Sequence, residues 1–331
     1  MEHKTIYFII TQRCNCQCYF CIRKNIESYG DIDITKLREI TTELSSHYSG
    51  SEAIITGGEF FLHDDWQSIL SIISSRFKSV YITSNGTFPL DVFKKLEPFL
   101  VSNVYIQLSI DGIKEIHNKI RGLNTFELLD KNIIRLQKYK THLALSTTVS
   151  KQNINNLNLL ISYLNSFSFS HWKCSPEQTN DANIDNIIMP KEWNELIDKI
   201  LPLCRFKVLT KKLFAFELMD EYLKKDYRYK TTPIYNCGYA SSKFYIMPNF
   251  DVYPCTCVET NKLCNLIEDP LWLLDKRLLD LQNCVTPQNQ VCRSCRYISI
   301  CKGGCPGYSL KFFGKLGMGD IRCPLIQKYI E

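Results

Sequence analysis

The sequence predicts an α/β fold in which a parallel sheet is built from repeated strand–helix units. In the first two-thirds of the 331 residues, short segments rich in Val, Ile and Tyr alternate with segments of helical periodicity. The helical segments are long enough to serve as the crossovers that join parallel strands. Six strands are expected, either in an open sheet or closed into a barrel.

The elements can be placed in chain order. The expected strands are Lys4–Thr11, Glu52–Thr56, Ser79–Ser84, Asn103–Ile110, His142–Val149 and Phe169–Ser175. The expected helices are Asp33–Tyr48, Trp66–Ser75, Leu90–Leu96, Thr125–Lys138, Asn153–Leu164 and Lys191–Leu203. After about Thr231 helical periodicity fades and cysteines, glycines and aromatic residues become frequent. We therefore expect a boundary near Tyr227–Pro233, between domains 1–230 and 231–331.

Composition excludes several classes of protein. With 45% hydrophobic and 22% charged residues the chain is typical of a globular protein. Its apolar runs are far shorter than the ~18 residues of a membrane span. Its first residues, MEHKT, lack the apolar region of a signal peptide. We expect a cytoplasmic protein without membrane contact. The net charge of +6 comes without a basic run, so no nucleic-acid partner is expected.

The 16 cysteines are unevenly distributed. Six lie in Arg13–Cys21 and Pro254–Cys257, and five lie in Cys292–Cys323. In a reducing cytosol, clustered cysteines are metal ligands more often than disulfides. Scattered ones such as Cys204 and Cys284 are expected to be buried thiols.

Chemistry-bearing residues follow the expected strands, where parallel sheets place their active sites. The motifs at these strand ends are RCNCQCYFC (Arg13–Cys21), GGE (Gly57–Glu59), SNG (Ser84–Gly86), SIDG (Ser109–Gly112) and KCSPE (Lys173–Glu177). Turn formation alone explains part of the glycine content, but it does not explain the cysteines.

The first cysteine group reads C-x3-C-x2-C. A structural zinc site takes four ligands, whereas three cysteines can hold three irons of a [4Fe–4S] cluster and leave the fourth open. This spacing after the first strand, followed in order by GGE, SNG, LSIDG and HNKIRG, resembles the radical SAM superfamily. The resemblance implies a partial (β/α)6 TIM-like barrel.

The resemblance also assigns residues. Cys14, Cys18 and Cys21 would hold the cluster that binds S-adenosylmethionine (SAM), and Cys16 would be a bystander. The GGE motif would bind the methionyl amino group, and Phe60 follows it where the family usually has proline. The cofactor-binding residues carried over are Phe20, Gly57, Gly58, Glu59, Ser84, Asn85, Ser109, Asp111 and Arg121. Among these, Arg121 would pair with the SAM carboxylate, Ser109 would contact its ribose or carboxylate region, and Phe20 would pack near the adenine.

A second cysteine group resembles the pattern of the SPASM domain, although Phe250 occupies the position where that pattern has glycine. Its members are Cys237, Cys255, Cys292, Cys295, Cys301, Cys305 and Cys323. The resemblance implies a small cysteine-rich domain with a short β-hairpin and helices, which carries two auxiliary [4Fe–4S] clusters, hence three in all. The outer one would be held by Cys292, Cys295, Cys301 and Cys323, and the inner one by Cys237, Cys255 and Cys305. The fourth inner ligand stays open: Cys257, Cys204 or Cys174 could supply it, or one iron faces the substrate. A zinc ribbon at Cys292–Cys305 is the alternative, but it leaves Cys237, Cys255 and Cys323 unused.

The resemblance implies that SAM is cleaved reductively to a 5′-deoxyadenosyl radical, which abstracts hydrogen from the substrate. A ribosomally made precursor peptide is expected as substrate, modified by a C–C or C–S crosslink or by epimerisation. The alternatives are a small-molecule (aminoglycoside-like) dehydrogenase or epimerase, a sulfatase-maturase-like protein dehydrogenase, and a non-enzymatic iron–sulfur or zinc protein.

Residue roles and partners follow from the same resemblance. Cys174 or Cys257 could donate a hydrogen atom in an epimerase, and Lys173 and Glu177 are polar candidates at the rim. Because the first strand is expected near Lys4, no N-terminal peptide-recognition domain is expected, so a separate recognition protein could serve. A flavodoxin or ferredoxin is expected as electron donor.

Overall fold

The predicted strands form one curved sheet in the computed structural model, which describes residues 3–22, 30–178, 183–224, 237, 239–258, 261–285 and 287–330. Ten strands of this described part are joined in the order β10-β9-β8-β1-β2-β3-β4-β5-β6-β7. Neighbours from β8 to β7 are parallel, and β9 is antiparallel to both β8 and β10.

All six expected strands and all six expected helices are confirmed. The strands are β1 (Thr5–Ile9), β2 (Glu52–Thr56), β3 (Ser79–Ser84), β4 (Val104–Ser109), β5 (Leu143–Val149) and β6 (His171–Pro176). The helices are α1 (Ile34–His47), α2 (Trp66–Ser74), α3 (Leu90–Leu96), α5 (Thr125–Arg135), α6 (Leu157–Leu164) and α7 (Pro190–Ile200). The Asp33 side chain caps α1 by accepting a hydrogen bond from the Lys36 N–H.

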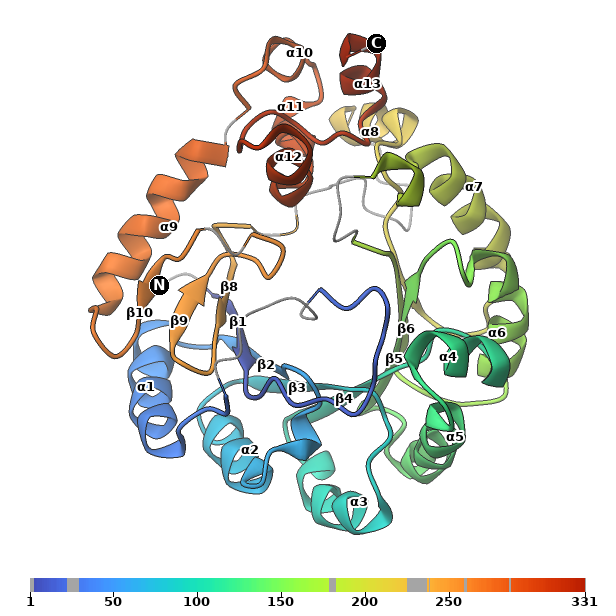
Figure 1. Cartoon of the computed structure of the whole chain (residues 1–331), viewed down its shortest axis with the longest axis vertical. Coiled ribbons are helices and arrows are strands. Elements are labelled where there is room, and N and C mark those ends of the chain that lie inside the picture. The colour runs from blue at the N-terminus through green and yellow to red at the C-terminus, as the bar shows by residue number, and fades with distance from the viewer. Residues whose placement is uncertain are drawn as a thin grey trace.

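The helices cover the outer, convex face of the sheet, and the segment after β1 lies on its inner side (Figure 1). Residues alternate along each strand between these two faces. In β1, Ile6 and Phe8 are fully buried and share one core with Leu37 and Leu44 of α1, whereas Tyr7 between them is half-buried. The hydrophobic core therefore lies between sheet and helices, and the inner face carries polar and aromatic side chains.

Two short elements were not expected. Helix α4 (Lys114–Arg121) has the sequence KEIHNKIR, which offers only two apolar residues, and β7 (Val208–Leu209) is two residues long. Short 3-10 helices flank several elements: η1 (Phe60–Leu62), η2 (Glu97–Val101), η3 (Leu136–Tyr139), η4 (Ile154–Asn156), η5 (Ile184–Asn186) and η6 (Leu201–Leu203). Several of them extend predicted helices at their ends.

The C-terminal third continues the same sheet. The predicted boundary at residues 230/231 lies outside the described residues, but β8 (Lys243–Ile246) beyond it pairs with β1. β8 and β9 (Asp251–Tyr253) form the predicted short hairpin, and β10 (Cys264–Asn265) adds one more short strand beside β9. The expected helices of this region are present, and α9 (Leu271–Val285) spans 15 residues although helical periodicity is weak in the sequence here. Its leucines bury one side of the helix against the sheet core.

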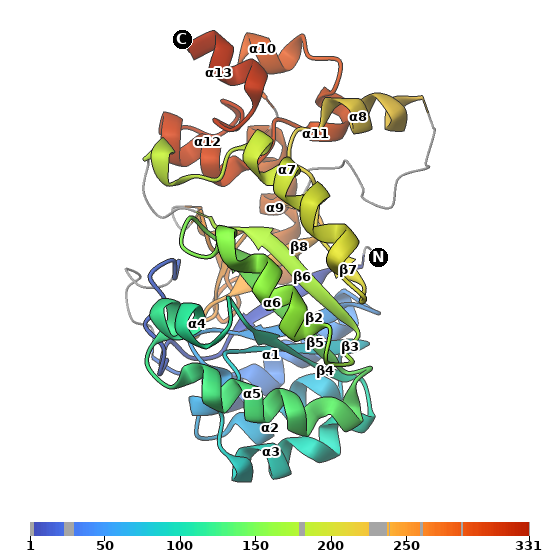
Figure 2. The same cartoon turned by 90° about the vertical axis from the view of Figure 1, so that its right-hand side faces the viewer.

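The remaining helices are short and carry most of the second cysteine group. They are α8 (Phe216–Leu223), α10 (Gln290–Arg293), α11 (Ile298–Cys301), α12 (Pro306–Phe313) and α13 (Pro324–Ile330). Both views place them together at one end of the molecule, opposite α2 and α3 (Figures 1 and 2). Within the residues that the structure describes, we find no helix whose length and apolar character would let it cross a bilayer.

Candidate active site

The first cysteine group lies on the loop after β1, at the carboxyl ends of the strands. The loop is anchored at its base, where the Arg13 N–H donates to the Thr11 hydroxyl at 3.0 Å and the Arg13 guanidinium pairs with Asp31 at 2.6 Å. The Cys14 side chain is exposed, and Cys18 and Cys21 are half-buried. The three predicted cluster ligands thus lie on an accessible loop.

The thiols differ in their acid–base properties. A hydrogen bond with Cys16 is the main cause that lowers the pKa of Cys14 to about 6 and that of Cys18 to about 7. Nearby Arg121 lowers both further. The hydrogen bonds with Cys14 and Cys18 raise the pKa of Cys16. Cys14 and Cys18 therefore form thiolates more readily than Cys16 does.

Two glycines let the end of β2 approach this loop closely. A Cβ at Gly57 would lie 2.4 Å from the Thr11 carbonyl oxygen, and one at Gly58 would lie 2.1 Å from that of Arg13. Because neither glycine has a Cβ, the Gly58 N–H can donate to Thr11 O at 2.7 Å and the Glu59 N–H can donate to Arg13 O at 2.8 Å. The GGE motif therefore fixes the backbone of the cysteine loop.

Glu59 joins the GGE and SNG motifs. Its carboxylate is 2% exposed and accepts hydrogen bonds from the Ser84 hydroxyl at 2.8 Å and the Asn85 N–H at 2.7 Å. Burial raises the pKa of Glu59 to about 7, and these two hydrogen bonds partly oppose the rise. Asn85 also donates to the Asn15 side chain at 2.7 Å. The ends of β2 and β3 and the cysteine loop thus form one hydrogen-bonded unit.

Asp111 and Arg121 form a buried ion pair next to this unit. Arg121 Nε donates to Asp111 at 2.6 Å, and the other Asp111 carboxylate oxygen accepts from the Thr148 N–H at 2.9 Å. Burial alone would lower the pKa of Arg121, but Asp111 and Cys18 raise it overall. The guanidinium also lies 5.8 Å from the centre of the Phe20 ring. Arg121 therefore links α4 to the cysteine loop and stays charged.

These residues all lie at one rim of the sheet. Ser109 is the last residue of β4 and is buried. At the far side, the Tyr19 hydroxyl of the cysteine loop donates to Glu177 after β6 at 3.1 Å. The predicted cofactor-binding residues are thus brought together, around a loop that carries four cysteines.

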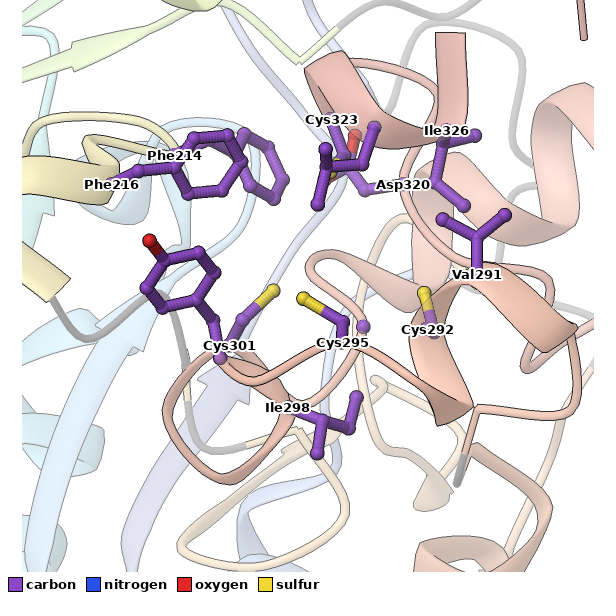
Figure 3. A pocket seen from close by; sticks show the side chains of 13 residues that line it. Phe214, Phe216, Val291, Cys292, Cys295, Ile298, Cys301, Asp320, Cys323 and Ile326 are labelled. Carbon is purple, nitrogen blue, oxygen red and sulfur yellow. The ribbon is translucent and has the colours of Figure 1, made fainter. Parts of the chain in front are cut away.

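Four cysteines of the second group line one pocket between α8, α10, α11 and α13 (Figure 3). They are Cys292, Cys295, Cys301 and Cys323, and Phe214, Phe216 and Asp320 line the same space. In the described part of the chain, no three histidine, cysteine or carboxylate groups converge on a point for a single metal ion. A [4Fe–4S] cluster places each thiolate on a different iron, so its ligands surround a volume instead.

A buried side-chain donor that fits such a group lies beside Cys292, one of the four cysteines. Asn289 Nδ2 has no hydrogen-bond partner among the described residues. It lies beside Cys292, since a Cβ at Gly319 would be 3.1 Å from Cys292 Sγ and 3.2 Å from Asn289 Nδ2. An unpaired buried donor costs free energy unless an acceptor is present. Cluster sulfur or a ligating thiolate would be that acceptor.

The inner group gathers four cysteines rather than three. Tyr239 and Tyr245 each have Cys237 and Cys255 as charged neighbours, and Tyr245 also has Cys257. A Cβ at Gly307 would lie 3.3 Å from the Cys257 Cβ and 3.5 Å from the Cys305 Sγ. The buried Tyr239 hydroxyl has no hydrogen-bond partner in the described part of the chain, although the Asn261 side chain is near. Cys257 therefore lies with the predicted inner ligands.

The other candidates for that group lie elsewhere. Cys174 is 2% exposed and belongs to the core between sheet and helices, with Trp172 on the same face of β6. Burial raises its pKa, and Cys204 is a neighbour. Both thiols are thus on the outer side of the sheet. Cys174 thus lies in the core outside the sheet, a placement that does not favour the predicted role as hydrogen-atom donor to a substrate inside the barrel.

Sequence reasoning missed several residues that support the site. Asn15 donates to Thr87 at 2.8 Å, and Thr87 in turn donates to Asn85. Asp320 and Arg322 form a fully buried ion pair at 2.8 Å, and Asp320 accepts from the Cys305 N–H at 3.0 Å. Because Asp320 also lines the outer pocket, it connects the four outer cysteines with Cys305 of the inner group. Asp320 and Arg322 lie two residues apart in a loop, so no helical or strand pattern in the sequence predicts that they are buried.

Comparisons with known proteins identify the domain that carries these motifs. Residues 8–163 match the model of the radical SAM superfamily. The chain is 21% identical to a cysteine-type anaerobic sulfatase-maturating enzyme of Clostridium novyi, over 97% of this chain and 92% of that protein. It is 26% identical to the antilisterial bacteriocin subtilosin biosynthesis protein AlbA of Bacillus subtilis, over 44% of this chain and 33% of that protein.

Solved structures share the fold. The structure of anSMEcpe with bound AdoMet aligns with a TM-score of 0.75 at 19% identity, covering 99% of this chain and 95% of that one. Streptococcus suis SuiB aligns with a TM-score of 0.77 at 17% identity, covering 97% and 77%. The matched superfamily implies a [4Fe–4S] cluster and SAM as cofactors. Residues 8–163 therefore form a radical SAM domain, and the chain is an enzyme that carries it.

Proposed function

We propose that this enzyme modifies a peptide by radical chemistry started at the rim of its barrel. The observation that carries the proposal is the hydrogen-bonded unit of the cysteine loop, Gly57-Gly58-Glu59 and Ser84-Asn85. Cys14, Cys18 and Cys21 would hold the first [4Fe–4S] cluster. When bound there, the cluster and SAM supply a 5′-deoxyadenosyl radical that abstracts hydrogen from the substrate.

The residues around the loop would bind and orient SAM. The GGE backbone and the Glu59 carboxylate suit an amino group, since both present oxygen acceptors. Arg121 uses Nε for Asp111, which leaves the other guanidinium nitrogens as donors for a carboxylate. Phe20 offers an apolar ring near the adenine, and Ser109 and Asp111 close the same rim from β4.

We further propose two auxiliary clusters. Cys292, Cys295, Cys301 and Cys323 would hold the outer one, supported by the pocket and by the Asn289 donor. Cys237, Cys255, Cys257 and Cys305 would hold the inner one, with Cys257 as the fourth ligand, because it is the spare thiol beside this group. Burial raises the pKa of both Cys301 and Cys305 to about 12, so binding must release protons from these thiols.

A peptide substrate is supported by the relatives. AlbA and the sporulation killing factor maturation protein SkfB of Bacillus subtilis carry peptide products in their names. One matched structure is SuiB bound to its precursor peptide SuiA, and others are anSMEcpe with bound peptides. A crosslink or an epimerisation is the proposed change. A flavodoxin or ferredoxin would deliver electrons, and a separate protein could present the peptide.

A second candidate is a small-molecule substrate. The chain is 23% identical to an Fe-coproporphyrin III synthase of Methanosarcina barkeri over 97% of this chain and 88% of that protein. Both candidate functions would use the same site among the described residues, so an assay with each kind of substrate must distinguish them.

The test begins with iron and labile sulfide on anaerobically reconstituted protein. About twelve of each per chain are expected for three clusters, and Cys257→Ala should change the inner cluster's electron paramagnetic resonance spectrum. Cys284→Ala is the matched control, since Cys284 is exposed and lies outside both groups. An unchanged spectrum in Cys257→Ala would remove Cys257 from the ligand set.

The reaction is then tested with SAM, a reductant and candidate substrates. Formation of 5′-deoxyadenosine should stop in Cys14→Ala and persist in Cys284→Ala. Product masses in D2O separate the reactions: a gain of one unit indicates epimerisation, and a loss of two hydrogens indicates crosslinking. Turnover of a small molecule in place of every peptide would favour the second candidate.

A further inference from the structure

The two halves of the cysteine loop are bound to different strands of the sheet. The first half is hydrogen-bonded to the ends of β2 and β3 through Arg13 and Asn15. After Cys18 the chain reaches β6 instead, where the Tyr19 hydroxyl donates to Glu177 Oε2 at 3.1 Å. Figure 1 shows the segment after β1 crossing the inner side of the sheet towards β5 and β6. Because 36% of Tyr19 is exposed, this hydrogen bond, more than packing, fixes its side chain.

Phe20 follows Tyr19 and contacts it directly. The two rings meet edge to face, with centroids 5.2 Å apart and planes at 72°. The Arg121 guanidinium carbon lies 5.8 Å from the centre of the Phe20 ring, and Asp111 holds Arg121 by an ion pair at 2.6 Å. The orientation of the Phe20 ring therefore depends on Tyr19 as well as on Arg121.

The backbone of Glu177 is held by two other elements. Its N–H donates to the Val149 carbonyl oxygen of β5 at 2.7 Å, and its carbonyl oxygen accepts from the Tyr308 hydroxyl of α12 at 3.4 Å. Tyr308 is buried, and the Arg322 guanidinium carbon lies 3.8 Å from the centre of its ring. Glu177 therefore presents its carboxylate to Tyr19 from a fixed position. A hydrogen bond to an ionised carboxylate is also stronger than one to a neutral acceptor.

We propose that Glu177 is a positioning residue for SAM: it holds Tyr19, and Tyr19 holds the Phe20 ring against which the adenine would pack. The inference rests on the proposed SAM site and adds to it two residues that act through Phe20. A ring that is already oriented loses little rotational freedom when a ligand packs on it, so the hydrogen bond lowers the entropic cost of binding. Without this bond, Tyr19 and Phe20 adopt several orientations in the free enzyme, and SAM binds more weakly.

Equilibrium dialysis with radiolabelled SAM measures this effect without turnover, on anaerobically reconstituted enzyme that receives neither reductant nor substrate. We expect Tyr19→Phe and Glu177→Met each to raise the Kd for SAM about tenfold, the usual size for a lost hydrogen bond to a charged group. The double variant should bind no more weakly than either single variant, because both changes remove the same bond. Glu177→Gln keeps an acceptor and should recover most of the affinity. Tyr163→Phe is the matched control with unchanged Kd, since Tyr163 donates to Asp130 between α6 and α5, outside the sheet.

A second cycle tests whether Tyr19 acts through Phe20. In a Phe20→Leu background no aromatic ring is left to orient, so Tyr19→Phe should raise the Kd by less than about twofold. The full tenfold loss in this background would show that Tyr19 acts on SAM by another route, and it would overturn the proposal.

The remaining outcomes are also distinct. An unchanged Kd in Tyr19→Phe or in Glu177→Met overturns the positioning role and leaves the SAM site intact; a loss in Glu177→Met alone would mean that Glu177 contacts SAM directly. Loss of iron in Tyr19→Phe would mean that the bond serves cluster assembly, which overturns the proposal as well. If the wild-type enzyme itself fails to bind SAM, the proposed function is contradicted together with the inference.

Discussion

The Ser84 hydroxyl donates a hydrogen bond of 2.8 Å to the buried carboxylate of Glu59. This bond joins the ends of two neighbouring strands, β2 and β3, beneath the cysteine loop. It satisfies one oxygen of a carboxylate that water cannot reach, and the Asn85 N–H satisfies the other at 2.7 Å. The pKa of Glu59 is nevertheless raised to about 7, because burial outweighs the two bonds.

The raised pKa makes stability depend on pH. Ionising Glu59 costs more in the folded than in the unfolded chain, so its stabilising contribution is complete below about pH 4.5 and is lost as pH rises through 7. A shift of this size corresponds to at most roughly 3 kcal/mol. We therefore expect Glu59→Gln to gain stability relative to wild type between pH 5 and pH 8. Urea unfolding of the cluster-free protein measures the difference. Glu115→Gln, at an exposed position, should show none, and a flat Glu59→Gln difference would contradict the assigned burial.

The contact of Gly58 with the cysteine loop gives a second prediction. In Gly58→Ala the new Cβ would meet the Arg13 carbonyl oxygen at 2.1 Å, and backbone must move to relieve this. We expect a loss of about 1–3 kcal/mol in the free energy of unfolding and less iron at the first cysteine group. Gly314→Ala is the control, because no atom lies within 4 Å of its Cβ and only its φ of +65° opposes the change. Wild-type iron content in Gly58→Ala would show that the loop adapts.

The sequence predicted the parallel sheet because strands and helices of the first two-thirds have clear periods. It could not reveal α4, whose eight residues include only two apolar ones, nor that β8 joins β1 across a long stretch of chain. The motif residues at the rim were found since they are contiguous in sequence. The position of Cys257 beside Cys305 and the burial of Asp320 depend on contacts between distant loops, which periodicity does not encode.

The ion pair between Asp111 and Arg121 gives a third prediction. Both side chains are buried, and Asp111 is fully inaccessible. Arg121→Met leaves an unpaired buried carboxylate, and we expect it to cost about 3–5 kcal/mol. Asp111→Asn combined with Arg121→Met removes both charges, so the double variant should be more stable than the two single effects predict.

A double-mutant cycle by urea unfolding measures this coupling. Additive effects would mean that water compensates the unpaired carboxylate, in conflict with its burial. The exposed pair Lys151–Glu192 serves as the matched cycle, and its coupling should stay below about 1 kcal/mol.

Phe250 gives the last prediction, because it holds the left-handed conformation expected of the glycine that it replaces in the family pattern. Its φ is +65°, yet its ring is 2% exposed and packs in the core. The left-handed backbone costs roughly 1–2 kcal/mol for a residue with a Cβ, whereas removing a buried Phe ring costs about 3–5 kcal/mol. Packing therefore outweighs strain, which explains how phenylalanine is tolerated at this turn between β8 and β9.

Both Phe250→Ala and Phe250→Gly should lose stability, but Phe250→Gly should lose about 1 kcal/mol less, since glycine adopts positive φ without penalty. Phe244, fully buried in β8 and absent from the positive-φ residues, is the matched control. At that position Phe244→Gly should be less stable than Phe244→Ala, because an extended strand gives glycine no advantage. Urea unfolding of the four variants measures the order, and the same order at both positions would show that the turn at Phe250 carries no strain.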